Sequence, residues 1–246
     1  MAARGRVLIT RPAEDAGPLA QALEARGFNV LIEPLLHIRM LDGPAPDLAG
    51  VQALAFTSAN GVRALVHAAP DALAAGCPAF AVGPATAAAA RVAGFADVIS
   101  ADGDVGALAE LIAERLDPEA GAVLHVAGSH RAGDLAGRIE AAGFHARRAV
   151  LYEAEAAEAL SPETRAAIAA GEVGWVLIFS PRTAGLFVTL MQGAGLGALA
   201  NAICLAALSP AVAEAAAPLS WGEVRVAVAP RQDALLDALG PAPEGI

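Results

Sequence analysis

The sequence predicts an α/β fold of two lobes, each a parallel sheet flanked by helices, and three observations lead to this class. Short apolar runs alternate with helix-like stretches along the whole chain of 246 residues. The apolar runs are continuous, which is typical of strands that are covered on both faces. The second half of the chain repeats the first, so two similar lobes are expected. Alternating strands and helices imply right-handed crossovers between parallel strands.

Ten apolar runs are short enough to be strands. In the first half they are residues 7–10, 29–33, 53–57, 79–82 and 97–100. In the second half they are residues 122–126, 147–152, 175–179, 202–208 and 224–229. Two of the helices between them have clear ends. Leu19 and Leu23 share a helical face that stops at Gly27, and Ser161 with Pro162 predicts the N-cap and first turn of another helix.

The internal repeat has three parts. Residues 6–28 align with residues 122–144 without a gap, residues 56–58 align with 179–181, and residues 81–90 align with 207–216. Chance similarity between alanine-rich segments is the alternative explanation. Because the offsets differ by only a few residues, duplication of a unit of about 120 residues accounts for the pattern better.

Composition narrows the classes of function. The formal net charge of -10 argues against a nucleic-acid-binding protein, which needs a basic face, but it leaves room for a local site that binds a small anion. Cys77 and Cys204 are far apart in sequence and are expected to be free thiols. No signal peptide is recognisable at the start, and the uncharged stretch 194–213 contains Gly, Asn and Ser-Pro, so a loop and a buried strand are expected there. The chain is expected to be cytoplasmic, with no membrane partner.

Candidate binding residues lie in the turns that follow the predicted strands. In a parallel sheet such turns lead into helix N-termini, where free N–H groups and hydroxyls suit carboxylates or phosphates. The residues are Arg11, Thr57, Ser58, Asn60, Gly83, Thr86, Gly128, Ser129, Arg131, Ser180, Pro181, Thr183 and Ser209. For any single turn, simple capping of the next helix is the better explanation. The complete set, which recurs in both halves, favours a binding cleft.

The sequence lacks the motifs of several common binding and catalytic sites. The sequence lacks a P-loop, a dinucleotide-binding fingerprint after a strand, a nucleophile elbow and a cluster spaced for a metal. Neither a metal nor a covalent mechanism is therefore indicated, and any catalysis must come from positioning and polarisation. His125 lies inside an apolar strand and is interpreted as a core histidine with satisfied hydrogen bonds, and His130 in a turn is a weak candidate. Tyr152 is the single tyrosine, and its hydroxyl could exchange a proton if it faced a cleft.

Taken in order, the motifs resemble those of the uroporphyrinogen-III synthase family. They are VLITRP, GFNVLIEPLLHI, LAFTSANGVRAL, AVGPATAAA, LYEA and LIFSPRTAGLF, and they extend over nearly the whole chain. The sequence departs from the family pattern at residues 208–211, where Leu-Ser-Pro-Ala lacks the threonine of a G-x-x-T turn. Ser209 is expected to replace that hydroxyl.

The resemblance implies a particular arrangement of the lobes. Residues 1–36 and 156–246 would form lobe one, and residues 39–149 would form lobe two. Residues 35–39 and 149–155 would be a pair of extended linker strands. The duplicated halves would thereby exchange their first strand–helix units, and Tyr152 would face the cleft.

The resemblance also implies a reaction without a cofactor, carried out by a monomer. The linear tetrapyrrole hydroxymethylbilane, with eight carboxylates, would be cyclised to uroporphyrinogen III with inversion of ring D and loss of water. The turn residues would hold the carboxylates, with charge from Arg11 and Arg131, and Tyr152 would assist departure of the hydroxyl group. The alternative is a non-catalytic two-lobed protein that binds a small anion, such as a degenerate paralogue of the synthase.

Overall fold

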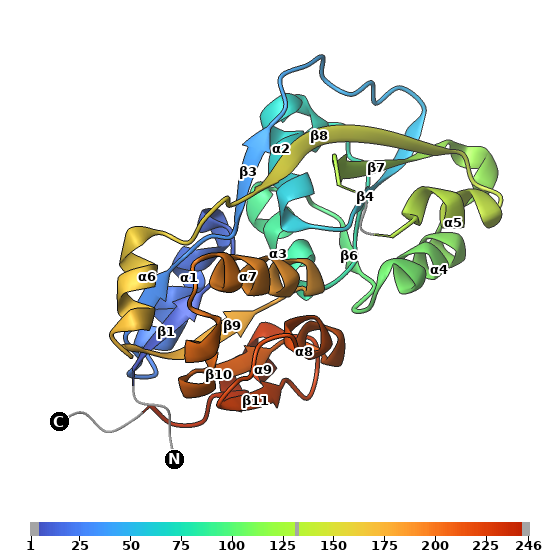
Figure 1. The fold of residues 1–246 in the computed structure, drawn as a ribbon. Helices are drawn as coiled ribbons and strands as arrows, with labels where there is room; N and C mark the ends of the chain where they lie inside the picture. The colour runs from blue at the N-terminus through green and yellow to red at the C-terminus, as the bar shows by residue number, and fades with distance from the viewer. Residues whose placement is uncertain (1–4, 131–132, 243–246) are drawn as a thin grey trace. The chain divides into compact units, whose positions relative to one another are not determined.

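The computed structural model of the chain describes residues 5–130 and 133–242. The chain folds into two compact units. Unit 1 comprises residues 1–37 and 155–246, and unit 2 comprises residues 38–154, so unit 1 is discontinuous in sequence. Each unit contains a sheet with helices packed on it (Figure 1). The predicted α/β class, with parallel sheets flanked by helices, is confirmed.

Unit 1 is built on a five-stranded sheet in the order β11-β10-β9-β1-β2, and every pairing in it is parallel. Its strands are β1 (Arg6–Ile9), β2 (Val30–Ile32), β9 (Val173–Ile178), β10 (Cys204–Ala207) and β11 (Glu223–Val226). Its helices are α1 (Ala13–Glu24), α6 (Pro162–Ala169), α7 (Pro181–Gly193), η3 (Gly197–Ala202), α8 (Pro210–Ala216) and α9 (Gln232–Ala238). The uncharged stretch 194–213 therefore supplies a loop, the short helix η3, the buried strand β10 and the start of α8, as expected.

Unit 2 contains most of a six-stranded sheet in the order β3-β8-β7-β4-β5-β6. Its strands are β3 (Leu36–Met40), β4 (Val51–Phe56), β5 (Ala79–Ala81), β6 (Val98–Ser100), β7 (Ala122–Gly128) and β8 (Ala146–Ala156). Its helices are α2 (Ala59–Ala68), η1 (Pro70–Leu73), α3 (Pro84–Ala93), α4 (Val105–Arg115), η2 (Pro118–Ala120) and α5 (Leu135–Ala141).

The order of the strands shows the exchange of the first strand–helix units. Strand β1 pairs with β9 from the second half of the chain, whereas β7 pairs with β4 from the first half. The order β2-β1-β9-β10-β11 in unit 1 corresponds to the order β8-β7-β4-β5-β6 in unit 2. At each place in this order, the two strands are partners in the internal repeat. The two sheets therefore have the same order, although the repeats contribute to them crosswise.

Both faces are buried along the central strands of each sheet, which explains the continuous apolar runs. In unit 1, Leu8 and Val176 pack under α6, α7 and α8, whereas Val7 and Leu177 pack under α1 and α9. In unit 2, residues 54, 56, 124 and 126 pack under α2 and α3, whereas residues 53, 55 and 123 pack under α4 and α5. Because successive side chains of a strand point to opposite faces, each strand contributes to both cores.

Strand β3 is absent from the ten strands that the residue pattern predicts, and β8 is longer than predicted. The Leu41 N–H donates to the Leu151 carbonyl at 2.9 Å, and Arg39 forms an ion pair with Glu153 at 2.6 Å. Because the residue numbers fall along β8 as they rise along β3, the two strands run antiparallel. Alternate residues of β3 are exposed, so its sequence has no continuous apolar run to reveal it.

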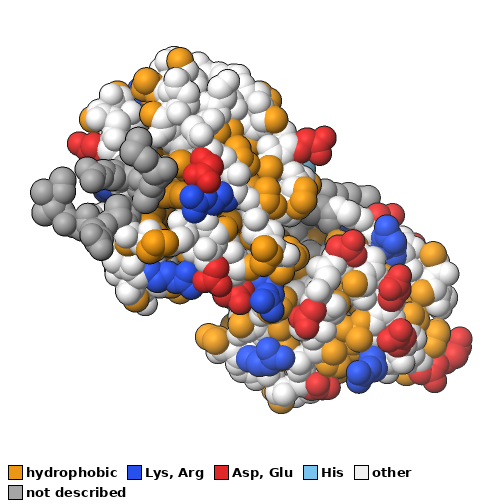
Figure 2. All heavy atoms as spheres, turned by 90° about the horizontal axis from the view of Figure 1, so that it is seen from below, with side chains coloured by type: hydrophobic (Ala, Val, Ile, Leu, Met, Phe, Trp, Pro, Cys, Tyr) orange, Lys and Arg blue, Asp and Glu red, His pale blue; other side chains and the backbone are white. Residues whose placement is uncertain are grey.

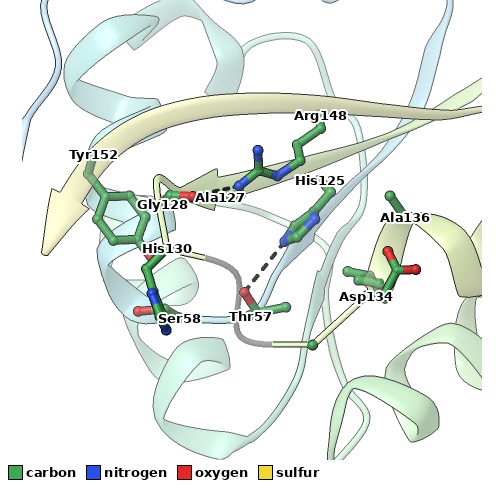
Figure 3. A pocket seen from close by; sticks show the side chains of 12 residues that line it. Thr57, Ser58, His125, Ala127, Gly128, His130, Asp134, Ala136, Arg148 and Tyr152 are labelled. Atoms are coloured by element: carbon green, nitrogen blue, oxygen red, sulfur yellow. Dashed lines mark hydrogen bonds between the residues drawn. The ribbon is translucent and has the colours of Figure 1, made fainter. Parts of the chain in front are cut away.

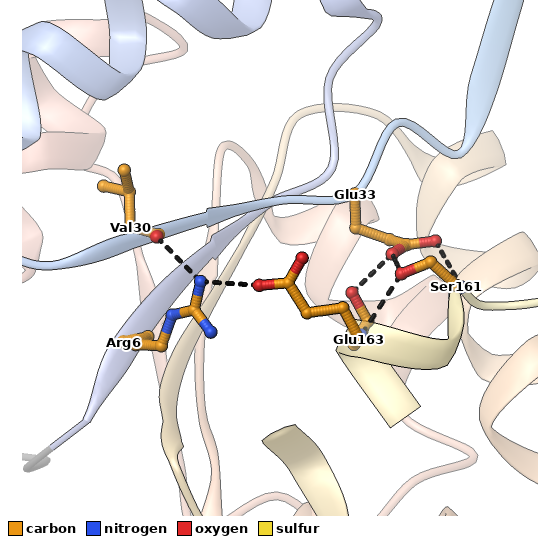
Figure 4. Close-up of polar contacts among 6 residues, drawn as sticks. Arg6, Val30, Glu33, Ser161 and Glu163 are labelled. Atoms are coloured by element: carbon orange, nitrogen blue, oxygen red, sulfur yellow. Dashed lines mark hydrogen bonds and ion pairs between the residues drawn. The ribbon is translucent and has the colours of Figure 1, made fainter. Parts of the chain in front are cut away.

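A buried carboxylate joins the end of β2 to the first turn of α6 (Figure 4). Glu33 is only 4% exposed, and it accepts hydrogen bonds from the Ser161 N–H at 2.9 Å and the Ser161 hydroxyl at 2.5 Å. It also accepts a hydrogen bond from the hydroxyl of Thr164. Negative charge at a helix N-terminus is stabilised by the helix dipole and the free N–H groups. Ser161 caps α6 as the sequence predicts.

Candidate active site

Within unit 2, the candidate turns meet at one edge of the sheet. Thr57 follows β4, Gly83 follows β5 and Ser129 follows β7, and these three strands are neighbours and parallel. The carboxyl ends of parallel strands lie on the same edge, which is where open α/β sheets bind their ligands. The sequence therefore identified the edge of unit 2 that carries its polar turns.

A cavity of about 120 Å³ opens at this edge. Four of the predicted site residues line it, namely Thr57, Ser58, Gly128 and Tyr152. His125, His130, Asp134 and Arg148 line it as well (Figure 3). Asn60, Gly83, Thr86 and Ser129 are not among the lining residues. Arg131 lies outside the described residues.

Tyr152 is buried, with 9% of its surface exposed, and its backbone continues the sheet through a hydrogen bond from the Ser129 N–H to its carbonyl at 2.9 Å. The register between β7 and β8 shifts at Ala127 and Gly128, so that Gly128 stands opposite Tyr152. A Cβ atom at position 128 would lie 2.8 Å from Cε2 of the Tyr152 ring. The glycine therefore leaves the space that this ring occupies.

The interpretation of His125 as a satisfied core histidine is wrong. The side chain is buried, with 8% of its surface exposed, but Nδ1 has no hydrogen-bond partner among the described residues. Nε2 has only a long contact of 3.5 Å with Oγ1 of Thr57. Burial, together with the positive charge of Arg148, lowers the pKa of His125 to about 4, so the ring is neutral at pH 7.

The signal that was missed is the alternation of side chains along β7. His125 shares its face with Val123, and in the register of the sheet it stands beside Ala55 of β4 and Arg148 of β8. Thr57 follows Ala55 by two residues and lies on the same face, so the sequence contained the grouping of Thr57, His125 and Arg148. The guanidinium of Arg148 donates to the Gly128 carbonyl at 2.7 Å (Figure 3).

Several predicted binding residues of unit 2 lie at helix starts. The Ser58 hydroxyl accepts from the Asn60 N–H at 3.1 Å at the start of α2, and the Asn60 side-chain oxygen accepts from Arg63. Gly83 is the N-cap of α3 and offers no side-chain cap. Thr86, in the first turn of α3, is buried. The Ser58 side chain therefore caps α2. At the start of α3, by contrast, no N-cap side chain accepts a hydrogen bond from the backbone N–H groups.

In unit 1, the corresponding edge carries Arg11 after β1, Ser180 after β9 and Ser209 after β10. Ser180 caps α7 by accepting from the Thr183 N–H at 3.1 Å, its hydroxyl lies 2.8 Å from that of Thr183, and Pro181 occupies the first turn. The Ser209 side chain does not cap α8, so its hydroxyl, unlike that of Ser180, accepts no hydrogen bond from the first turn of its helix.

The guanidinium of Arg11 has several partners within unit 1. It forms an ion pair with Asp15 at 3.3 Å, donates to the side-chain oxygen of Gln232 at 2.9 Å and lies 4.6 Å from the centre of the Phe179 ring. Its charge is therefore partly neutralised before any ligand binds. On the face seen in Figure 2, basic side chains lie singly among acidic and apolar ones.

The described residues contain neither a cluster of metal ligands nor a membrane-spanning helix. No group of three or more His, Cys, Asp or Glu side chains within residues 5–130 and 133–242 is placed to hold a metal ion. No helix in those ranges has the length and apolar character needed to cross a membrane. Cys77 and Cys204 are free thiols, as expected.

Comparison with known proteins gives consistent matches. Residues 17–237 match the family described as Uroporphyrinogen-III synthase HemD. Over 72 residues the chain is 38% identical to a uroporphyrinogen-III synthase of Chlorobaculum parvum. That alignment covers 27% of this chain and spans 29% of the length of the relative.

Two solved structures share the fold. The uroporphyrinogen-III synthetase of Helicobacter pylori superposes with a TM-score of 0.64 at 16% identity, covering 95% of this chain and 97% of that one. A mutant uroporphyrinogen III synthase of Thermus thermophilus superposes with a TM-score of 0.54 at 19% identity, covering 95% and 96%. Because the family match extends from residue 17 to residue 237, the chain belongs to the uroporphyrinogen-III synthase HemD family.

Proposed function

We propose that the protein is a uroporphyrinogen-III synthase, a lyase that cyclises hydroxymethylbilane to uroporphyrinogen III with inversion of ring D and loss of water. The observation that carries the proposal is the family match over residues 17–237. The cavity beside Tyr152 and Thr57 supports it, because it gives unit 2 a polar site at the sheet edge where ligands of such folds bind.

The chemistry suits a site without an activated nucleophile. Loss of hydroxide from the hydroxymethyl group leaves an electrophilic carbon, and the electrons of the pyrrole ring supply the driving force. The terminal pyrrole then attacks at its substituted carbon, and rearrangement of the resulting intermediate inverts that ring. The protein has to hold the chain in the conformation that makes this attack faster than simple closure.

Each predicted residue has a role in this proposal. Main-chain N–H groups and hydroxyls at the sheet edges bind the carboxylates of the substrate, together with the guanidinium groups of Arg11 and Arg131. The residues are Arg11, Thr57, Ser58, Asn60, Gly83, Thr86, Gly128, Ser129, Arg131, Ser180, Pro181, Thr183 and Ser209. Pro181 has no N–H group and instead fixes the first turn of α7. Tyr152 is the catalytic residue that donates a hydrogen bond to the departing hydroxyl group. We further propose that the enzyme acts as a monomer in the cytoplasm.

A coupled assay tests the proposal. The purified protein is added to freshly generated hydroxymethylbilane, and the uroporphyrin isomers are separated after oxidation. The type III isomer is expected to dominate. If only the type I isomer of spontaneous closure accumulates, the enzyme assignment is wrong, and a non-catalytic protein that binds the polyanion becomes the better explanation.

A further inference from the structure

We propose that His125 and Arg148 form a subsite inside unit 2 that binds one short carboxylate arm of the ligand. The two side chains stand beside each other in the register of β7 and β8, and both line the cavity. Identifying the arm as one of the substrate's carboxylates rests on the proposed function. The existence of the subsite rests on the geometry of unit 2.

The first support is the unsatisfied hydrogen bonding of His125. Buried polar groups in native proteins almost always have a partner, so an unpaired ring nitrogen calls for an explanation. His125 lines a cavity, and neither ring nitrogen has a strong bond among the described residues, since the Nε2 contact is 3.5 Å long. Nδ1 itself has almost no accessible surface, so a carboxylate in the cavity would act on the ring through its charge and not through a hydrogen bond to Nδ1.

The second support is the size of the cavity. Its volume of about 120 Å³ is somewhat smaller than a cavity of about 150 Å³ that binds benzene. The space therefore fits an acetate or propionate arm and is much too small for four pyrrole rings. Arg148 carries five N–H donors, and the structure records one hydrogen bond from it among the described residues, to the Gly128 carbonyl.

The charged groups around His125 decide how the site responds to pH. Arg148 on β8 is positive, Asp134 before α5 is negative, and His130 and Tyr152 also line the cavity wall. Asp134 is exposed, and its carboxylate accepts from the Gly137 N–H at 3.1 Å. At pH 7 the positive charge of Arg148 acts on His125, which is neutral.

A carboxylate that enters this cavity favours the imidazolium form of His125, so its pKa must rise above about 4 on binding. By linkage, the ligand binds together with a proton, and its affinity increases as the pH falls from 7 to 5. Propionic acid is partly protonated at pH 5, so each affinity is calculated from the concentration of the ionised probe, and the change that remains reports on the protein.

The test is an NMR titration of the complete chain with ¹⁵N-labelled histidine, in which a His125→Gln variant assigns the signals. Sodium propionate is the probe, propionamide is its neutral counterpart, and sodium chloride keeps the ionic strength equal. We expect propionate to move the His125 signals, to raise its titration midpoint and to bind about tenfold more tightly at pH 5 than at pH 7. If His125 does not respond, or responds equally to propionamide, the subsite does not exist.

Neighbouring residues provide matched variants. Arg148→Gln is expected to weaken propionate binding about tenfold, whereas Arg147→Gln, whose guanidinium pairs with Asp47 elsewhere, is expected to leave it unchanged. Asp134→Asn keeps a residue suited to an N-cap, removes the repulsion and should strengthen binding. Equal effects of the two arginine variants would show that only net charge matters and would overturn the proposal.

The outcomes separate this inference from the proposed function. If propionate titrates His125 but no type III isomer forms in the coupled assay, the enzyme assignment fails and the subsite stands. If the type III isomer forms but His125 ignores propionate, the subsite alone is removed.

Discussion

Gly128 packs directly against the ring of Tyr152 in unit 2. A Cβ atom at position 128 would lie 2.8 Å from Cε2 and 2.9 Å from Cζ of the tyrosine. The close approach follows from the register shift that sets the two residues opposite each other on β7 and β8. Gly128, which the sequence predicts as a binding residue, therefore also positions Tyr152.

Gly128→Ala is expected to displace the tyrosine ring and to lower the free energy of unfolding by about 1–3 kcal/mol. Because Tyr152 is the only tyrosine, labelled tyrosine gives one set of NMR signals, and these should shift. Gly17→Ala in α1 is the control, since a Cβ there meets no atom within 4 Å. If the tyrosine signals stay in place in Gly128→Ala, the positioning role is wrong.

Tyr152→Phe should reduce the rate of type III formation by about 10- to 100-fold while the protein stays folded, because only the hydroxyl group is removed. The coupled isomer assay measures the rate. Thr189→Val removes an exposed hydroxyl from α7 that bonds the Gly185 carbonyl, and it should leave the rate unchanged. Similar rates for the two variants would take Tyr152 out of the mechanism.

Glu33→Gln should lower the free energy of unfolding by about 2–3 kcal/mol. The substitution replaces one accepting carboxylate oxygen with an NH₂ group, which cannot accept the hydrogen bonds that the neighbouring groups donate. Chemical denaturation at pH 7 measures the change. Glu163→Gln provides the matched control in the first turn of the same helix (Figure 4). Its side chain is 65% exposed and pairs with Arg6, so the cost should stay within about 1 kcal/mol. Equal costs would contradict a special role for the buried carboxylate.

His125 makes stability depend on pH in a defined direction. Its pKa is about 4 in the folded protein and near 6.5 in the unfolded chain, so between these values the unfolded state binds more protons. Stability should therefore be complete above pH 6.5 and fall towards pH 4, by up to about 3 kcal/mol from this residue.

Urea denaturation of the wild type and His125→Gln at pH 7, 6 and 5 isolates this contribution, since the carboxylates titrate alike in both proteins. The wild type should lose more stability than the variant as the pH falls. Parallel curves would mean that His125 titrates normally in the folded protein.

Sequence reasoning identified most of the fold because the central strands of the two cores are continuous apolar runs. All ten predicted strands are present, and Ser161 and Gly27 mark helix ends as expected. The residue pattern did not reveal strand β3, because its residues alternate between half-buried and exposed, whereas the family resemblance implied an extended linker strand at residues 35–39. For the candidate site, Thr57, Ser58, Gly128 and Tyr152 line one cavity, but His125 and Arg148 were not recognised as neighbours.

What the sequence by itself determined is the class of fold, the position of the turns and the family, since these depend on local patterns of burial, capping and motif order. Only the tertiary structure decided that His125 has a nitrogen beside a cavity with no partner among the described residues. That β1 joins β9 while β7 joins β4 was implied by the family resemblance, and no residue pattern predicted it. The reason is physical: pairing between strands that are distant in sequence, and the hydrogen bonds of a buried ring, depend on which segments pack together, and no local pattern encodes that choice.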